Sequence, residues 1–336
     1  MTLEAGRLER GLQKRRLSPV AFLMRWELLL VLLIIVASTI STWLSPHFLV
    51  QRNLLDMTFH FVERSIIALP MMLITISGNM VDLSVASTLA MTAVLMGVSY
   101  QAGLNIWLAV LLALVVGALG GLLNGMVIVK ARLSPIVVTL GTYSLYRGIA
   151  FVMLGNLYVT GYPPEFTYIG RGYVGNTPAP VPLVIFTILA VLFGLLLHRT
   201  TFGRFIYAMG GNEQACRYSG IAVDRIKIIL FLLSGLMSAL AGIMLSGRIG
   251  STRPNIALGS ELEVITAVVL GGVSISGGKG TVPGVILALF LIGIARWGMR
   301  LMGVPGEAVI VVIGLLLIVA ILLPELLRRL APGARE

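Results

Sequence analysis

Apolar runs of about 20 residues recur from one end of the chain to the other, and this repetition limits the possible folds more than any other feature. Crossing the roughly 30 Å hydrocarbon core of a bilayer takes about 20 apolar helical residues. Only helices and closed β-barrels satisfy their backbone hydrogen bonds in lipid. Because the runs are continuous and do not alternate with polar residues, they predict helices. The expected fold class is all-α, a polytopic membrane protein.

The composition agrees with this fold class. Of the 336 residues, 57% are hydrophobic and only 12% are charged, which is too little polar surface for a water-soluble domain. The net charge of +11 at pH 7 is by itself compatible with nucleic-acid binding. The basic residues, however, lie in short segments between apolar runs, as in the cytoplasmic loops of membrane proteins. We therefore expect contact with membrane lipid and no nucleic-acid partner.

The apolar runs predict about ten transmembrane helices. They cover residues 28–44, 62–78, 83–100, 107–129, 135–154, 183–197, 228–245, 262–273, 282–297 and 308–323. We expect the second to be kinked or interrupted near Pro70 and the eighth to be short and interrupted. With both termini cytoplasmic, most of the 25 Lys and Arg residues fall on the inside. The chain then divides into a basic tail (1–27), a transmembrane domain (28–323) and a second cytoplasmic tail (324–336).

Asp82 lies between two apolar runs, in the segment from Gly78 to Ser87. Asp82 and Ser84 are residue types that cap a helix N-terminus by accepting bonds from its free amides. A direct role in a membrane pathway is an equally open interpretation. Few carboxylates lie within the spans, and this disfavours an ion-driven secondary carrier, which needs buried acids as an ion relay.

Three glycines spaced by four, Gly117, Gly121 and Gly125, mark one face of the fourth predicted span. Small residues at this spacing let a second helix approach closely. We expect this face to pack against a helix of the same chain rather than against a second copy. Asn124, on the same face, is a candidate for a hydrogen bond across that contact.

Two polar segments interrupt the apolar pattern. Residues 210–221 predict a short helix capped by Asn212 and stopped by Gly220, which is either a simple connection or a docking surface. Residues 259–280 begin with acidic residues, continue with a short apolar run and end in glycines. This pattern predicts either a broken helix that lines a cavity or a tight turn at the cytoplasmic face.

The sequence contains no recognisable enzyme signature. The segment around Lys279 lacks a phosphate-binding loop because Gly280 follows the lysine where a Ser or Thr is required. The three histidines form no zinc-binding pair, there is no nucleophile elbow, and the single cysteine, Cys216, excludes a disulfide framework. We expect no catalytic residue, no metal and no cofactor, and an intramembrane enzyme is the least favoured alternative.

Four motifs in order resemble the permeases of the ribose-type sugar branch of ABC importers. They are Asn-Met-Val-Asp-Leu-Ser-Val-Ala-Ser at 79–87, Asn124-Gly125 followed by Val-Thr-Leu-Gly-Thr at 138–142, Gly-Asn-Glu-x-Ala to Ser-Gly-Ile at 211–221, and the glycine-rich pattern at 259–280. The first motif departs from the family pattern by one extra residue before Asp82 and by Ala86 in place of glycine.

The resemblance implies an ABC importer permease fold in the bacterial inner membrane. The partners it implies are a cytoplasmic ABC ATPase, a periplasmic substrate-binding protein and a second permease, either an identical copy or a paralogue. The coupling helix would lie at about 210–221, and its candidate ATPase contacts are Asn212, Glu213, Gln214, Ala215, Arg217 and Ser219. The candidates for lining or gating the translocation pathway are Asp82, Ser84, Ser87, Glu261, Thr266, Gly271 and Gly272.

The resemblance also indicates a substrate class. A monosaccharide similar to rhamnose, ribose or xylose is the main expectation, and the sugar-derived signal autoinducer-2 is the alternative. The segments Arg25-Trp26-Glu27, Ala68-Leu69-Pro70 and 265–272 look closest to permeases for rhamnose-like sugars and for autoinducer-2.

Overall fold

The computed structural model describes residues 26–45, 48–306, 308–312, 314, 315, 318 and 322. The helices are α3 (Trp26–Leu44), α4 (Gln51–Phe59), α5 (Val62–Ile76), α6 (Val85–Gln101), α7 (Ile106–Ala131), α8 (Pro135–Leu154), α9 (Pro164–Arg171), α10 (Val181–Arg199), α11 (Thr201–Gly211), α12 (Glu213–Tyr218), α13 (Val223–Ile249), α14 (Ser260–Leu270) and α15 (Val282–Leu301). The strands are β1 (Val159–Thr160) and β2 (Ser251–Thr252). The described residues between 306 and 322 are also helical. Of the predicted tails, 1–27 and 324–336, residues 1–25 and 324–336 lie outside the described residues, and Trp26 and Glu27 belong to α3.

Several of these helices are long and apolar enough to cross a membrane, which confirms the expected class of multi-pass helical protein. Six meet both conditions, namely α3, α7, α8, α10, α13 and α15, and α4 and α5 together form a bent pair that brings the number to seven. The shorter apolar helix α6 has 17 residues, and α14, which begins with two glutamates in its first turn, has only 11. At 1.5 Å per residue, α14 extends about 17 Å, roughly half of the hydrocarbon thickness. The count of ten spans therefore stays a prediction.

The bend in the second predicted span lies elsewhere than the sequence indicated. Pro70 lies inside α5, which continues through it without interruption. The chain instead bends by 54° at the break between α4 and α5, where His60 and Phe61 separate the two helices. A proline removes one backbone donor, and in α5 the surrounding helices bury the helix on nearly all sides, so the packing holds it in shape.

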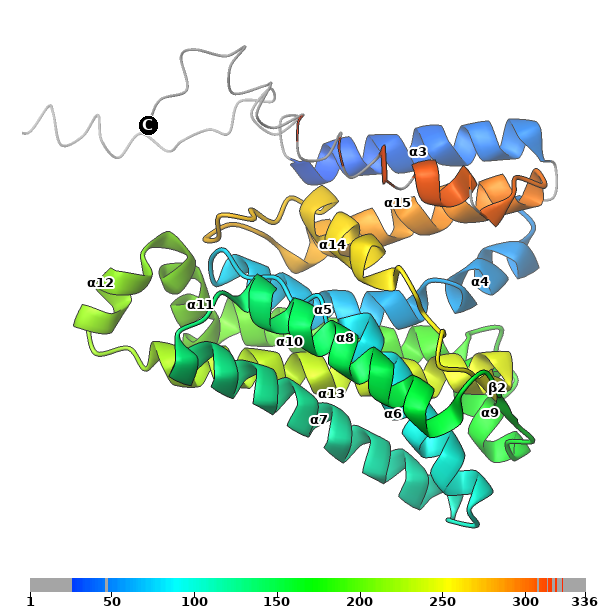
Figure 1. Ribbon diagram of the computed structural model, residues 1–336. Coiled ribbons are helices and arrows are strands. Elements are labelled where there is room, and N and C mark those ends of the chain that lie inside the picture. Colours follow the sequence, from blue (N-terminus) through cyan, green and yellow to red (C-terminus); the bar gives the residue numbers. More distant parts are fainter. Residues whose placement is uncertain are drawn as a thin grey trace, which may run out of the picture.

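Helix α13 is the centre of the bundle. It packs against α5, α6, α7 and α9, and most of its small and apolar residues are buried. Its 27 residues correspond to about 40 Å, which exceeds the thickness of a hydrocarbon core. Figure 1 shows α12 at one end of this helix and β2 at the other. We call these the α12 end and the sheet end.

The glycine face of α7 lies against α13. A Cβ atom added at Gly121 would lie 2.1 Å from the carbonyl oxygen of Phe231, and one added at Gly125 would lie 2.9 Å from the Cα of Ile228. Both distances are shorter than any real carbon contact, so glycine is required for the two backbones to approach this closely. In the structure this face is thus occupied by a helix of the same chain.

The remaining elements complete the two ends. Helices α3 and α15 lie side by side along one flank of the bundle (Figure 1). The segment between α8 and α10 contains β1 and α9. Strands β1 and β2 pair antiparallel, with Val159 opposite Thr252, and this pairing ties the loop after α8 to the end of α13.

Replacing Gly121 by alanine is expected to lower the unfolding free energy by about 2 kcal/mol, because the new methyl group would force α7 and α13 apart. The measurement is the thermal unfolding of the purified protein in detergent. The matched control is Gly194→Ala in α10, where an added Cβ meets nothing within 4 Å. That change should leave stability equal or slightly higher, by about 0.5 kcal/mol. If the Gly121→Ala protein unfolds at the same temperature as the wild type, the close contact between α7 and α13 does not require glycine at this position.

Candidate coupling and translocation sites

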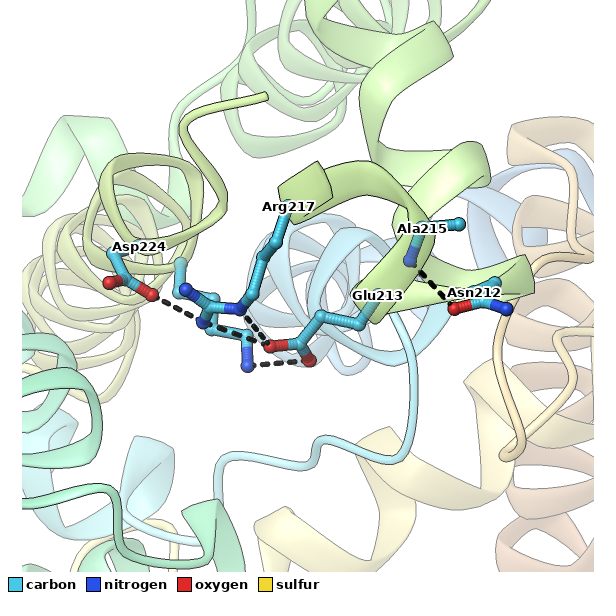
Figure 2. Close-up of polar contacts among 6 residues, drawn as sticks. Asn212, Glu213, Ala215, Arg217 and Asp224 are labelled. Atoms are coloured by element: carbon cyan, nitrogen blue, oxygen red, sulfur yellow. Dashed lines mark hydrogen bonds and ion pairs between the residues drawn. The ribbon is translucent and has the colours of Figure 1, made fainter. Parts of the chain in front are cut away.

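The short helix α12 begins as the sequence predicts. The side-chain oxygen of Asn212 accepts a hydrogen bond from the backbone amide of Ala215 at 2.9 Å, which is an N-cap, and Gly220 follows the helix with a positive φ of 80° (Figure 2). Cys216 is the residue of α12 that faces the interior. The helix therefore protrudes from the bundle with one side anchored and the other exposed.

Two ion pairs brace α12 against the first turns of α13, and a third lies within α12. Arg217 donates to Glu213 at 3.0 Å and to Asp224 at 2.5 Å, and Lys227 donates to the second carboxylate oxygen of Glu213 at 2.8 Å (Figure 2). Exposed pairs of this kind contribute only ~0.2–1 kcal/mol each. Together they hold the orientation of a helix that is too short to be stable alone.

The charges of this network stay in place over a wide pH range. Partial burial alone would raise the pKa of the Glu213 carboxyl, but the bonds and charges of Lys227 and Arg217 outweigh burial and leave that pKa below its ordinary value. The hydrogen bond to Asp224 raises the pKa of Arg217. A carboxyl whose pKa is lowered in the folded protein contributes stability above its unfolded pKa, near 4.3, and loses it only as pH falls below that value. The brace is therefore complete at neutral pH.

The exposed side of α12 includes one residue that the sequence analysis missed. Gln214, Ala215 and Ser219 are exposed, and the ring of Tyr218 is 91% exposed. A tyrosine that packs against nothing in its own chain is unusual, because large aromatic side chains dominate the energetics of cores and interfaces. The helical positions carry a signal that could have identified it: Tyr218 is two residues from the buried Cys216 and so points to the opposite side.

A junction of glycines connects α12 to two other parts of the bundle. A Cβ atom at Gly210, just before α12, would lie 2.0 Å from the carbonyl oxygen of Ile76 and 2.2 Å from the amide nitrogen of Gly278. Gly278 also donates to the Ile76 carbonyl at 2.8 Å. The end of α11, the end of α5 and the loop after α14 therefore touch backbone to backbone.

Asp82 lies at the centre of a buried polar network and does not line an open pathway in this structure. Its carboxylate accepts bonds from the Ser84 amide at 2.9 Å, the Ser84 hydroxyl at 2.6 Å and the Ser234 hydroxyl of α13 at 2.7 Å. Asn124 donates to the Ser84 hydroxyl at 2.9 Å, so this residue bonds to the turn between α5 and α6 rather than across the seam with α13. Ser84 occupies the N-cap position of α6, but its side chain caps no amide because the carboxylate and Asn124 engage it.

The other predicted pathway residues are also packed inside the chain. Ser87 and Thr266 are buried, and each donates back to a carbonyl of its own helix region. Gly271 packs against α15, and Gly272 packs against the ring of Trp26, whose indole donates to the Leu270 carbonyl at 2.7 Å. The exceptions are Glu261, which is part-exposed at the first turn of α14, and Gly272, which is exposed. The structure thus brings Asp82 and Ser84 together and leaves Glu261, Thr266, Gly271 and Gly272 on a separate element.

The sheet end carries a charged cluster that the sequence analysis also missed. Arg64 pairs with Glu263 at 2.6 Å, Glu263 also binds Arg296, and Arg248 pairs with Glu63 at 2.5 Å. The cluster joins α5, α13, α14 and α15, and its side chains are largely buried. Removing one partner of a buried pair costs ~3–5 kcal/mol because the other charge is left uncompensated. Charged residues near the ends of four apolar helices are the signal, since charges within a bundle must find partners.

Across the described ranges, no three His, Cys, Asp or Glu side chains come together in a way that could hold a metal ion. Long apolar helices around α13, a polar buried turn, and a braced short helix at one end define a multi-pass membrane protein of the transporter class.

Comparison with known proteins places the chain within that class. Residues 53–321 match the family described as branched-chain amino acid transport system / permease component, and the chain belongs to this family. It is an ABC-type importer permease, a transport component and not an enzyme, and the resemblance found in the sequence motifs is confirmed. No solved structure shows a significant match to the chain.

The chain is also similar to individual curated proteins. The autoinducer 2 import system permease protein LsrD of Klebsiella pneumoniae subsp. pneumoniae is 37% identical over 305 residues, covering 89% of this chain and 91% of the relative. The proteins of the same name from Escherichia coli O9:H4 and from Shigella flexneri are each 36% identical over 303 residues, covering 88% of this chain and 91% of each relative.

Replacing Asp82 by alanine is expected to lower the unfolding free energy by about 3 kcal/mol, because three buried donors lose their acceptor and each costs ~1–3 kcal/mol when unpaired. Thermal unfolding in detergent measures the effect. The control is Ser87→Ala, which removes a single bond to the Ser84 carbonyl and should cost no more than about 1 kcal/mol. Equal stability of the two variants would show that the Asp82 network contributes little.

Proposed function

We propose that this chain forms the membrane pathway of an ATP-driven importer for autoinducer-2, in preference to rhamnose, ribose or xylose. The observation that carries the proposal is the similarity to autoinducer 2 import permeases, at 36–37% identity over nearly the whole chain. The main expectation from the sequence, a monosaccharide, becomes the second candidate, because both ligands are compact and polyhydroxylated and share the same requirements for passage.

The energy would come from a separate cytoplasmic ABC ATPase that docks on α12. The support is the exposed side of this helix, where Gln214, Ala215 and Tyr218 face away from the bundle, and the ion pairs that fix its direction. A cleft of about 340 Å³ runs beside it, between Arg217 and residues 220–225. Asn212, Glu213 and Ser219 would position the surface rather than supply most of its contact area, because Asn212 caps the helix and Glu213 is engaged in ion pairs.

Movement of α12 would be transmitted to the pathway through the contacts of Gly210 with Ile76 and Gly278, which we call the glycine junction. The junction contacts the end of α5 and the loop after α14, and the candidate gating residues lie next to these elements. Asp82, Ser84 and Ser87 lie in the turn after α5 and the start of α6, and Glu261, Thr266, Gly271 and Gly272 lie in α14 and just after it. Because the described chain packs most of them inside, we assign them to gating and not to the lining of an open path. Their role would be to hold α5, α6 and α14 in one of two alternative arrangements.

The remaining parts of the proposal concern topology and assembly. We propose ten spans with both termini cytoplasmic, in a bacterial inner membrane, which places the α12 end inside the cell and the sheet end outside. A periplasmic binding protein would then deliver ligand to the sheet end, and a second permease, identical or paralogous, would complete the pathway. The transmembrane domain would cover residues 28–323 between two cytoplasmic tails.

Uptake into proteoliposomes tests the substrate. The complete importer, purified with its ATPase and supplied with its binding protein, is expected to accumulate labelled autoinducer-2 only when ATP is present on the α12 side. Labelled rhamnose, ribose and xylose serve as matched ligands in the same vesicles. Uptake of one of these sugars and not of autoinducer-2 would replace the first candidate by the second. Uptake by this chain alone under an ion gradient would contradict the ABC mechanism.

Replacing Tyr218 by alanine is expected to weaken the association with the ATPase by about 2 kcal/mol, or roughly 30-fold in Kd, since a fully exposed aromatic residue is a typical interface anchor. A pull-down of the ATPase with the tagged chain in mild detergent measures the loss. Tyr168→Ala, a half-exposed tyrosine in α9 at the sheet end, is the control and should leave recovery unchanged. Equal recovery of the ATPase with both variants would show that Tyr218 of α12 is not part of the ATPase contact.

A further inference from the structure

A cleft with both polar and apolar lining opens at the sheet end of the molecule, between the end of α8 with the loop after it and the loop after β2. Its volume is about 240 Å³, smaller than the ~300–1,000 Å³ of pockets for drug-sized ligands. The side chains around it include Asn156, Tyr158, Arg253 and Asn255, all of them exposed. None of them belongs to the gating network or to α12.

The small sheet brings these residues together from distant parts of the chain. Tyr158 directly precedes β1 and Arg253 directly follows β2, and the antiparallel register places Val159 opposite Thr252. Neighbours of a paired position in this register face each other across the strands. The guanidinium of Arg253 accordingly lies 5.4 Å from the centre of the Tyr158 ring. The pairing thus builds one wall of the cleft.

A chain of buried hydrogen bonds fixes the strands that carry this wall. The Tyr162 hydroxyl bonds to the Thr252 hydroxyl at 2.8 Å, and Thr252 donates to Ser246 at 2.8 Å. Both Tyr162 and Thr252 are buried. The strand positions next to Tyr158 and Arg253 are therefore fixed, while those two side chains remain open to solvent.

Arg147 holds the loop after β2 that carries Asn255. This buried arginine of α8 donates to the Pro254 carbonyl at 2.7 Å, to the Ile256 carbonyl at 3.0 Å and to the Ala86 carbonyl at 3.2 Å. The two loop carbonyls flank Asn255, so the position of that residue is set by a charge-assisted clamp. Ala257, next to the clamp, has a φ of 58°, which is strained for a residue with a side chain and persists only where the surroundings enforce it.

The chemistry of the cleft fits a small ligand with several hydroxyl groups. Each asparagine side chain offers a donor and an acceptor, the arginine offers donors, and the tyrosine ring offers an apolar face beside its hydroxyl. A hydroxyl group needs both kinds of partner. The cleft has no carboxylate among its lining residues, so it lacks the group that would favour a cation. Weak and multiple hydrogen bonds hold a ligand without trapping it.

We propose that this cleft is a docking site at which a compact polyhydroxylated ligand, released by the binding protein, is held before it enters the pathway. The proposal rests on the proposed function for the ligand class and for the orientation that puts the sheet end outside. It assigns Tyr158 and Asn255 as ligand-binding residues and Arg147 as the residue that positions Asn255.

Kinetics of the reconstituted importer form the first test. Tyr158→Ala and Asn255→Ala are each expected to raise the KM for autoinducer-2 about fivefold, with little change in the maximal rate, since each removes a ring face or a neutral hydrogen-bonding group worth ~1 kcal/mol. Tyr158→Phe should keep most of the affinity. The matched control is Asn176→Ala, an exposed asparagine in the loop between α9 and α10, which should keep the wild-type KM. Import with an unchanged KM in both alanine variants would show that the cleft does not bind the ligand, and it would leave the proposed function unaffected.

A second measurement does not depend on transport. Asn255→Cys, in a Cys216→Ala background that removes the single native thiol, is labelled with a maleimide in the intact complex in nanodiscs. Autoinducer-2, rhamnose, ribose or xylose at millimolar concentration should slow labelling at least threefold, whereas Asn176→Cys should label at the same rate with and without ligand. If the importer transports none of the four ligands, the proposed function fails and this assay alone decides: protection of the cysteine at position 255 supports the cleft, and equal rates with every ligand overturn it.

Discussion

The close contact between α7 and α13 is the constraint on which the rest of the bundle depends. Lipid offers no hydrophobic driving force between helices, so association relies on packing and on buried polar bonds. At Gly121 and Gly125 the two backbones approach within a distance that no other residue allows. Ser234 of α13 then reaches the Asp82 carboxylate, and Asn124 of α7 reaches Ser84, so the same pair of helices also holds the turn between α5 and α6.

The two ends of α13 are built for different tasks. At one end, exposed ion pairs fix the direction of a helix whose outer side is free, an arrangement suited to a reversible contact with a partner. At the other end, buried pairs between Arg64, Glu263 and Arg296 join three helices, and breaking them is costly. The glycine junction around Gly210 links the first end to α5 and to the loop after α14, and α5 begins within the second. Packed contacts therefore run from α11, next to α12, through α5 to the buried ion pairs.

Several sequence predictions hold in the structure because they depend on local chemistry. The apolar runs form helices, Asn212 caps α12 and Gly220 ends it, and the motifs identify the family. Other predictions change because a distant residue competes for the same group. The Ser84 hydroxyl caps no amide since Asp82 and Asn124 hold it, and α5 passes through Pro70 since neighbouring helices enclose it. The sequence motifs favoured a monosaccharide, whereas the similar curated proteins are autoinducer 2 import permeases. The motifs could not separate the two ligands because they serve the passage of either one.

The sequence by itself determines that this chain is a multi-pass helical protein, because hydropathy, glycine spacing and capping residues act over a few neighbouring positions. Its four ordered motifs identify the permease family. Only the tertiary structure decides which residues meet. Tyr158 and Arg253 are 95 positions apart and become neighbours through two short strands, and Arg147 reaches a loop more than 100 residues away. Contacts between distant segments depend on how all the helices pack at once, and no local pattern in the chain records that packing.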